Sequence, residues 1–452
     1  MTQSAERIEL RAMLRLAAPL VGAELGWMLM GIEDTMCVGR VSADAIGAVS
    51  LGSMVFYTIG ICASGSLLGL DTLVSQAYGA GDTDDCRHSL INGIWLALIL
   101  CAPVMFALEA VIPLLATFGV DAGVMHDTRL YMRVLNLSAL PLLMYFGLRR
   151  YLQSINIVRP VVMTLVYSNL VNIALNLILV FGRFGAPKMG AVGAGWATFF
   201  SRMFMMMGLA IVIVRMDPAI LHASWKPDFA RIRKLLKLGL PAAGQIGLET
   251  GVFATVTVLI GKIGATAIAG HQIALSVVST TFMLPLGISS AAGVRVGHAI
   301  GRGDPKGAAR SGWTALALGG IVMSMAAVTL LVVPQWIARI FTPETDIIAV
   351  GVTLLRVAAF FQLFDGLQVV ATGALRGTGD TRTAMICHFT GYWVIGLPLG
   401  ALLCFHYGLG AKGLWMGLSA GLILIGIVLA LFWRHAVKRL EATMTTPIEA
   451  GP

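Results

Sequence analysis

Charged side chains are scarce in this sequence. Only 12% of its 452 residues are Asp, Glu, Lys or Arg, whereas 57% are hydrophobic, and soluble domains carry about 25% charged residues. That much apolar surface cannot be buried inside a water-soluble particle of this length. The same composition excludes disordered, collagen-like and disulfide-scaffold proteins. We therefore predict an integral membrane protein.

Paired cysteines and catalytic signatures are also lacking. The six cysteines are scattered in or beside apolar runs, none forms CxxC, and no histidine stands at metal-ligand spacing from one. Neither a disulfide framework nor a zinc site is predicted. No HExxH motif and no paired Ser/Lys or His/Asp signature stands out in the apolar runs. A membrane-embedded enzyme therefore ranks last among the functions considered, and no cofactor is expected.

Long apolar runs are abundant instead. A helix needs about 20 mostly apolar residues to cross the hydrocarbon core of a membrane. By that length the chain holds twelve predicted transmembrane helices, and so an all-α fold, at about 13–37, 47–73, 91–118, 128–152, 160–181, 191–214, 238–260, 273–296, 312–333, 348–375, 385–407 and 413–434.

The two halves of the chain repeat each other. With a shift of 222 residues, LRLAAP at 14–19 meets LKLGLP at 236–241, and VSQAYGAGD at 74–82 meets VGHAIGRGD at 296–304. Six spans separate equivalent positions, so both halves enter the membrane from the same side, as in the parallel repeats of transporters. The most polar connection lies between them. We predict an N-terminal six-helix lobe, a cytoplasmic linker and a C-terminal six-helix lobe at 1–220, 221–237 and 238–452.

The basic residues predict the orientation of the chain. The net charge of +9 is spread between the apolar runs rather than gathered on one face, which argues against nucleic-acid binding. Of the 32 Lys and Arg, 22 fall on the side of the N-terminus and nine on the opposite side, while Arg202 lies inside a span. Positive charge marks cytoplasmic loops. Both termini are therefore predicted to face the cytoplasm.

Three carboxylates fall well inside predicted spans. Asp34 lies in the first span, Glu249 in the seventh and Asp365 in the tenth. An ionisable group at mid-membrane costs about 2.5–3.5 kcal/mol on insertion scales, so each needs either an internal partner or a function. Under the repeat, Glu249 corresponds to Trp27 and Asp34 to Val256. The scaffold is duplicated but the acids are not, which favours specialised sites, one in each half.

Further polar residues in the spans have two open interpretations. Glu24 and Glu33 share the first span with Asp34 and either line a cavity or contact a neighbouring helix. A stripe of asparagines on one face of the fifth span either lines an aqueous cavity or bonds the next helix. Its members, spaced i, i+3 and i+7, are Asn169, Asn172 and Asn176.

The sequence resembles the multidrug and toxic compound extrusion (MATE) transporters, and within them the bacterial NorM-like branch. The matching stretches run in the family's order over nearly the whole chain: MGIEDTMCVGR at 30–40, VSQAYGAGD at 74–82, GHQIAL at 270–275, RVGHAIGRGD at 295–304, ALRGTGDTR at 374–382, GYWVIGLPLG at 391–400 and GAKGLWMGL at 410–418. Any one of these stretches is weak evidence, whereas together they are specific.

This resemblance implies a V-shaped pair of six-helix lobes in a bacterial inner membrane. It implies export of organic cations and other drug-like molecules in exchange for Na⁺ or H⁺. Asp34 matches the family's acid in the first span, and Glu249 and Asp365 match the acid pair associated with cation binding in the second lobe. The sequence departs from the family at Glu24, where Gln is frequent, and at Glu33, where an apolar residue is common.

A functional hypothesis combines these observations. Glu249 and Asp365 would bind the coupling cation, as ligands of Na⁺ if coupling uses sodium, because carboxylates hold either Na⁺ or a proton. Gln245 is a further lining residue, and an amide oxygen of Gln245 or Gln362 would complete the shell of the ion. Asp34 would bind a proton or a cationic drug. The expected partners are small-molecule substrates and membrane lipid, and the chain is expected to be a monomer. A flippase for lipid-linked glycans is the alternative, but its pyrophosphate substrate needs a cationic cavity, which these acids oppose.

Overall fold

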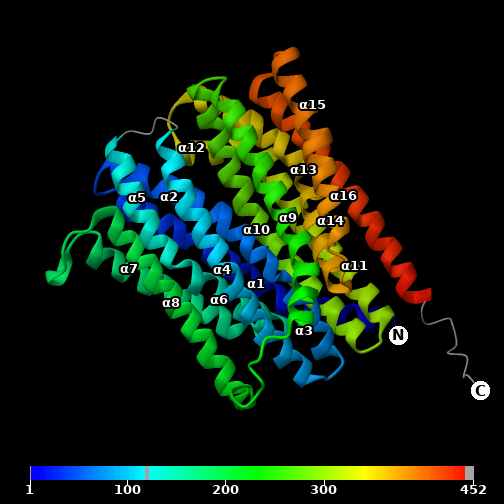
Figure 1. The fold of residues 1–452 in the computed structure, drawn as a ribbon. Coiled ribbons are helices and arrows are strands. Elements are labelled where there is room, and N and C mark those ends of the chain that lie inside the picture. Colours follow the sequence, from blue (N-terminus) through cyan, green and yellow to red (C-terminus); the bar gives the residue numbers. More distant parts are fainter. Residues whose placement is uncertain (1, 118–121, 443–452) are drawn as a thin grey trace, which may run out of the picture. The chain divides into compact units, whose positions relative to one another are not determined.

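The structure is a computed structural model that describes residues 2–117 and 122–442. Within those residues every regular element is a helix (Figure 1). Eleven helices are long and apolar enough to cross a membrane, and a bent pair of helices makes a twelfth span. The all-α, twelve-span architecture predicted from the sequence is confirmed.

The chain forms two compact units. The N unit comprises Gly22–Tyr78 and Asp82–Ala243, and the C unit comprises Met1–Val21, Gly79–Gly81 and Gly244–Pro452. The first and ninth helices are therefore each divided between the units, at Val21 and at Ala243. The lobes predicted at 1–220 and 238–452 remain a prediction about the domains that act in transport.

The N unit contains most of the first half of the chain. Its buried apolar side chains form one continuous core from Ala23 to Leu235. Its helices are α1 (Thr2–Val38, whose first part belongs to the C unit), α2 (Ala43–Gly65), η1 (Ser66–Leu68), α3 (Gly69–Gly79), α4 (Thr83–Ala116), α5 (Ala122–Leu137), α6 (Ala139–Ser154), α7 (Arg159–Leu179), η2 (Arg183–Gly185), α8 (Gly190–Met216) and η3 (Pro218–Leu221).

The C unit is built around α10 and α13, which pack against each other, with α11 and α16 also against α13. Its helices are α9 (Phe229–Gly261, whose first part belongs to the N unit), α10 (Ala265–Gly301), α11 (Pro305–Val332), α12 (Pro334–Phe341), α13 (Thr345–Thr378), α14 (Arg382–His388), η4 (Phe389–Gly396), α15 (Leu397–Ala401), η5 (Leu402–His406) and α16 (Gly410–Ala442). The short helix α12 was not predicted.

The fourth span differs from a simple helix. It consists of α5 and α6, which meet at an angle of 43°. Pro141, three residues into α6, has no N–H and so cannot continue the hydrogen-bond ladder of α5. At the break, Ser138 Oγ donates to Leu135 O at 2.5 Å and accepts a hydrogen bond from Arg202 Nη1 at 2.5 Å. The buried guanidinium of Arg202, which belongs to α8, therefore contacts the fourth span at its bend.

The repeated motif ending in Gly-x-Gly-Asp forms the same turn in both halves. Gly81 and Gly303 have φ of 78° and 69°, a left-handed conformation that favours glycine. The aspartate that follows each glycine caps the next helix: Asp82 accepts from the N–H of Asp85, and Asp304 from that of Gly307, both at 2.8 Å. The repeat found by shifting the sequence is therefore also a repeat of local structure.

The eleventh span contains two π-helical stretches. They are η4 and η5, separated by the short helix α15. π-helical turns within α-helices are frequent at functional sites. The first of them begins directly after His388, whose side chain is fully buried in the C unit.

Candidate ion-binding sites

Arginines neutralise several buried or half-buried acids of this protein. Each pair lies within one unit: Glu24 with Arg149, Asp71 with Arg150 at 3.5 Å, and Glu9 with Arg295 at 2.5 Å. Across residues 2–117 and 122–442, no Lys or Arg forms an ion pair with Asp34, Glu249 or Asp365. Because an uncompensated charge in a low-dielectric interior is costly, the absence of a basic partner sets Glu249 and Asp365 apart, whereas Asp34 also interacts electrostatically with Arg202 of α8.

Asp34 is held by neutral side chains of two other helices of the N unit. Its side chain is buried, with Oδ1 accepting from Asn176 Nδ2 at 2.7 Å and Oδ2 from Thr198 Oγ1 at 2.9 Å. Asn176 Nδ2 also donates to Asn172 Oδ1 at 2.9 Å. Thr198 Oγ1 also lies 3.0 Å from Ala194 O. The site therefore joins α1, α7 and α8.

The hydroxyl of Thr198 suits both protonation states of Asp34. A hydroxyl has one proton to donate and two lone pairs to accept with. When Asp34 is ionised, Thr198 donates to it. When Asp34 is protonated, the carboxyl group donates to Thr198, which then donates to Ala194 O. No side chain has to move between the two arrangements.

The asparagine stripe divides between two tasks. Asn172 and Asn176 form the Asp34 site, whereas Asn169 Nδ2 donates to Gly26 O on the first helix at 3.0 Å. All three are buried. Asn169 therefore bonds a neighbouring helix, and the other two surround the acid.

A second site in the C unit joins α9 and α13. Gln368 Nε2 donates to Asp365 Oδ1 at 3.2 Å and, in a long hydrogen bond, to Glu249 Oε1 at 3.5 Å. Asp365 and Gln368 lie on one face of α13 because they are three residues apart. Both are buried, and the Glu249 side chain is 16% exposed. One amide group thus bridges the two carboxylates that the sequence singled out.

His388 of α14 borders this site. Its Nδ1 lies 2.7 Å from Ala384 O, to which it donates, so in the neutral ring Nε2 is an acceptor. Gln245 Nε2 approaches that nitrogen at 3.4 Å, and Glu249 Oε2 is 3.9 Å from it. Gln245 lies one helical turn before Glu249 and contacts the ring of His388 at the edge of the acid pair.

The two remaining acids of the first span differ from Asp34. Glu24 is buried and paired with Arg149 of α6, which is also buried. Of the two interpretations of Glu24, the ion pair with Arg149 supports contact with a neighbouring helix. Glu33 is half-buried, and its Oε2 accepts no hydrogen bond from the described residues.

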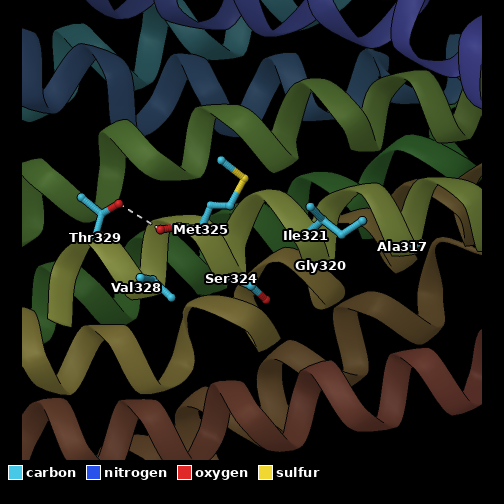
Figure 2. Close-up of a pocket in the computed structure, with 7 residues that line it drawn as sticks. All are labelled: Ala317, Gly320, Ile321, Ser324, Met325, Val328 and Thr329. Carbon is cyan, nitrogen blue, oxygen red and sulfur yellow. Dashed lines mark hydrogen bonds between the residues drawn. The ribbon is translucent and has the colours of Figure 1, made fainter. Parts of the chain in front are cut away.

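An apolar groove of about 790 Å³ runs along α11 of the C unit (Figure 2). Figure 2 shows one face of α11 lining it, with a hydroxyl at Ser324 and another at Thr329, which donates to Met325 O at 2.9 Å. None of the residues that line the groove belongs to either candidate site.

Comparison with known proteins identifies the family. A family model described as MatE matches residues 19–178 and 241–402, which lie in both halves of the chain. The chain belongs to the MatE family. The resemblance proposed from the sequence motifs is therefore confirmed.

Curated relatives cover almost the whole length of this MatE protein. "Multidrug resistance protein NorM" of Burkholderia vietnamiensis is 36% identical over 437 residues, which are 94% of this chain and 93% of that protein. "Probable multidrug resistance protein NorM" of Mesorhizobium japonicum is 34% identical over 438 residues, 94% of both chains.

Solved structures have the same fold. The eukaryotic MATE transporter AtDTX14 superposes with a TM-score of 0.87 at 22% identity, covering 97% of this chain and 99% of that one. A MATE in the bent conformation gives a TM-score of 0.89 at 20% identity, with 97% of both chains covered. The chain is therefore a multi-pass membrane transporter of the MATE fold and not an enzyme.

One string that was not singled out from the sequence matches the hydrolase motif GxSxG, and it has a structural role in this transporter. GLSAG at 417–421 fits the pattern GxSxG, but a nucleophile elbow requires a turn from a strand into a helix. Ser419 lies inside α16, and its hydroxyl donates to Trp415 O at 2.6 Å. Gly417 and Gly421 lie directly against the backbone of Gly400 and Gly391. The glycines allow close packing of helices.

Three residues of these sites were not singled out from the sequence: Thr198, Gln368 and His388. Gln368 had a local signal, because it lies three residues after Asp365 and hence on the same helical face. Thr198 and His388 had none, because their contacts with Asp34 and Glu249 join segments more than a hundred residues apart. Among the described residues no group of three or more His, Cys, Asp or Glu could hold a metal ion. A metal cation bound here would need neutral oxygens among its ligands.

Proposed function

We propose that this MatE protein is a multidrug efflux antiporter that exports organic cations and other drug-like compounds in exchange for Na⁺ or H⁺. The names of its NorM relatives, which refer to multidrug resistance, support this proposal. The observation that carries it is the contrast among the buried acids. Arginines neutralise Glu24 and Asp71, whereas Asp34, Glu249 and Asp365 contact only neutral or titratable side chains.

Glu249 and Asp365 bind the coupling cation in this proposal. Gln368 and Gln245 belong to the same cluster of side chains, which offers both carboxylate and amide groups. Hard cations such as Na⁺ prefer oxygen ligands, and a carboxylate also takes up a proton. Antiport requires that ion and drug occupancy oppose each other. A cationic drug that is attracted to the same carboxylates competes with the ion for them.

Asp34 binds a proton or the cationic group of a drug in the N unit. Its two partner side chains stabilise the ionised form, and the Thr198 hydroxyl accommodates the protonated form without rearrangement. Asp34 differs from Glu249 and Asp365 in that neither of its two hydrogen-bond donors, Asn176 and Thr198, links it to a second carboxylate. It is therefore suited to bind one proton or one organic cation.

Alternating access of the two six-helix lobes moves ion and drug across the membrane in opposite directions. We further propose that the protein works as a lipid-embedded monomer with both termini in the cytoplasm. The excess of Lys and Arg in the connections on the side of the N-terminus supports that orientation.

Drug uptake into inverted membrane vesicles, whose cytoplasmic face points outward, tests the function directly. A fluorescent organic cation is added outside vesicles that hold the higher Na⁺ concentration inside, and in parallel outside vesicles with an acidic interior. Drug transport that follows at least one gradient in the wild type, and is lost in Asp365→Asn vesicles of equal protein content, supports antiport. Transport that ignores both gradients, or that continues unchanged in the variant, contradicts it.

A further inference from the structure

Gln368 of α13 lies between the two carboxylates of the C unit. Its Nε2 lies between Asp365 Oδ1 at 3.2 Å and Glu249 Oε1 at 3.5 Å, so the two carboxylate oxygens are at most about 6.7 Å apart, the sum of these distances. The positive end of a neutral amide dipole thus stands between two negative groups. It is the only side-chain donor that bridges them among the described residues.

The orientation of this amide follows from its neighbours. An ionised carboxylate accepts hydrogen bonds and donates none, so while both acids are ionised the NH₂ end of Gln368 faces both of them. The oxygen end then has no donor: Gln368 Oε1 is buried and accepts no hydrogen bond within the described residues. Buried carbonyl oxygens normally have a partner. The arrangement satisfies the acids and leaves an oxygen ligand unused beside them.

We propose that Gln368 stands in for the coupling cation when the site is empty and becomes one of its ligands when a metal ion binds. This inference rests on the proposed function, because it takes Glu249 and Asp365 as the ion-binding pair. A half-turn about the last torsion of glutamine exchanges Nε2 and Oε1 without moving the carbon skeleton, and that torsion is broad and nearly two-fold. The incoming ion takes the place of the NH₂ group and gains an amide oxygen.

The ligands present favour Na⁺ as the metal ion. Two carboxylates alone do not complete the shell of a hard cation, which takes six or more oxygens at about 2.3–2.6 Å in the case of Ca²⁺. Gln368 Oε1 adds a third oxygen. One turn further along α13, the buried Thr372 Oγ1 also has no partner within the described residues, nor does Tyr392 OH of the eleventh span. Within the described residues the remaining ligands of the ion would therefore be neutral oxygens rather than a third carboxylate, and we take this to favour the singly charged Na⁺ over a divalent cation.

Two substitutions of Gln368 separate this role from a purely structural one. Gln368→Lys places a permanent ammonium between the acids, and Gln368→Met removes both ends of the amide at similar volume. Gln362 provides a matched control: it lies on the same helix, is equally buried, and donates to Thr281 Oγ1 at 2.9 Å rather than to either acid. The control is Gln362→Met, because a lysine at this position would lie one helical turn from Asp365.

The measurement is the melting temperature of purified full-length protein while NaCl replaces N-methyl-D-glucamine chloride at constant ionic strength. Na⁺ binding raises the melting temperature of the wild type by mass action. Gln368→Lys should show no Na⁺ response and should melt without Na⁺ no lower than the wild type does. Gln368→Met should bind Na⁺ about 10- to 100-fold more weakly, as is typical when a group that orients metal ligands is lost. Gln362→Met should keep the wild-type Na⁺ affinity.

The outcomes discriminate among the proposals. Wild-type Na⁺ affinity in Gln368→Met, or a normal Na⁺ response in Gln368→Lys, overturns the role of Gln368. A wild type that exports drug under a pH gradient but gains no stability from Na⁺ also overturns it, while antiport stands. If Na⁺ stabilises the wild type and Gln368→Met weakens that effect, the inference holds, even where vesicle efflux ignores both gradients and the proposed function fails.

Discussion

Neutralising Glu249 and Asp365, singly and together, tests whether they hold one cation in common. Glu249→Gln and Asp365→Asn each replace one carboxylate by an amide of the same size. Because Gln368 lies between the two groups, each variant keeps a bridging side chain in place. We expect each single variant to weaken both ion binding and ion-driven drug efflux, and the efflux of the double variant to be little worse than that of either.

The size of the effect follows from the geometry. With an effective dielectric constant of about 20, a cation about 2.4 Å from an oxygen is attracted by about 7 kcal/mol per carboxylate. A neutral amide oxygen retains about half of that attraction, since bonds to charged groups are about twice as strong as neutral ones. Drawing the two carboxylates from about 6.7 Å to about 5 Å around the ion costs about 1 kcal/mol in the wild type, which the variant avoids. The net loss is about 2.5 kcal/mol, or about 70-fold in Kd.

The assay combines Na⁺ titration of the purified protein with efflux from vesicles under the gradient that drives the wild type. Asn169→Ala is a matched control, because it removes a buried polar group of the N unit that contacts backbone rather than an acid. If the losses of ion-driven efflux in the two single variants multiply in the double variant, the two acids act independently. Full coupling in either single variant would refute the shared site outright.

Three further predictions concern the N unit and the orientation. Asp34→Asn should lower drug efflux at least tenfold while the protein stays inserted and abundant, because an amide satisfies the same two partners but binds no proton; wild-type export of every tested cation would contradict this. Glu24→Gln should lower the free energy of unfolding in denaturant by about 3–5 kcal/mol, because it leaves Arg149 as an unpaired buried charge. The double variant Glu24→Gln with Arg149→Met should recover most of that loss. Equal losses in the single and double variants would show that the unpaired arginine is not the cause. A reporter fused after residue 452 should read cytoplasmic, and a periplasmic signal would overturn the even number of spans.

Several features of the fold could be predicted because they depend on local sequence. An apolar run of about 20 residues has to be helical in a membrane, since lipid offers no hydrogen-bond partners to the backbone. The turn at Gly81 and Asp82 and its repeat at Gly303 and Asp304 also depend on local sequence, because each glycine and each capping aspartate acts on residues close to it in the chain. The bend of the fourth span was missed, although Pro141 signals it.

The chemistry of the acids could be predicted only in part. Insertion cost alone marks Asp34, Glu249 and Asp365 as exceptional, and that argument needs no structure. The same argument applies equally to Glu24, yet Arg149 of α6 neutralises it. The partner lies 125 residues away in the sequence, so no local pattern could separate a paired acid from an unpaired one.

The sequence by itself therefore determined that the chain crosses a membrane as repeated helices, because hydrophobic length and capping are local properties. It also determined which acids are costly at their depth. Only the tertiary structure decided which of them stay without an arginine, that α9 and α13 bring Glu249 and Asp365 to one amide group across 119 residues, and that the free oxygen of Gln368 lies beside them. Such contacts arise from helix packing, which depends on side chains distributed over the whole unit.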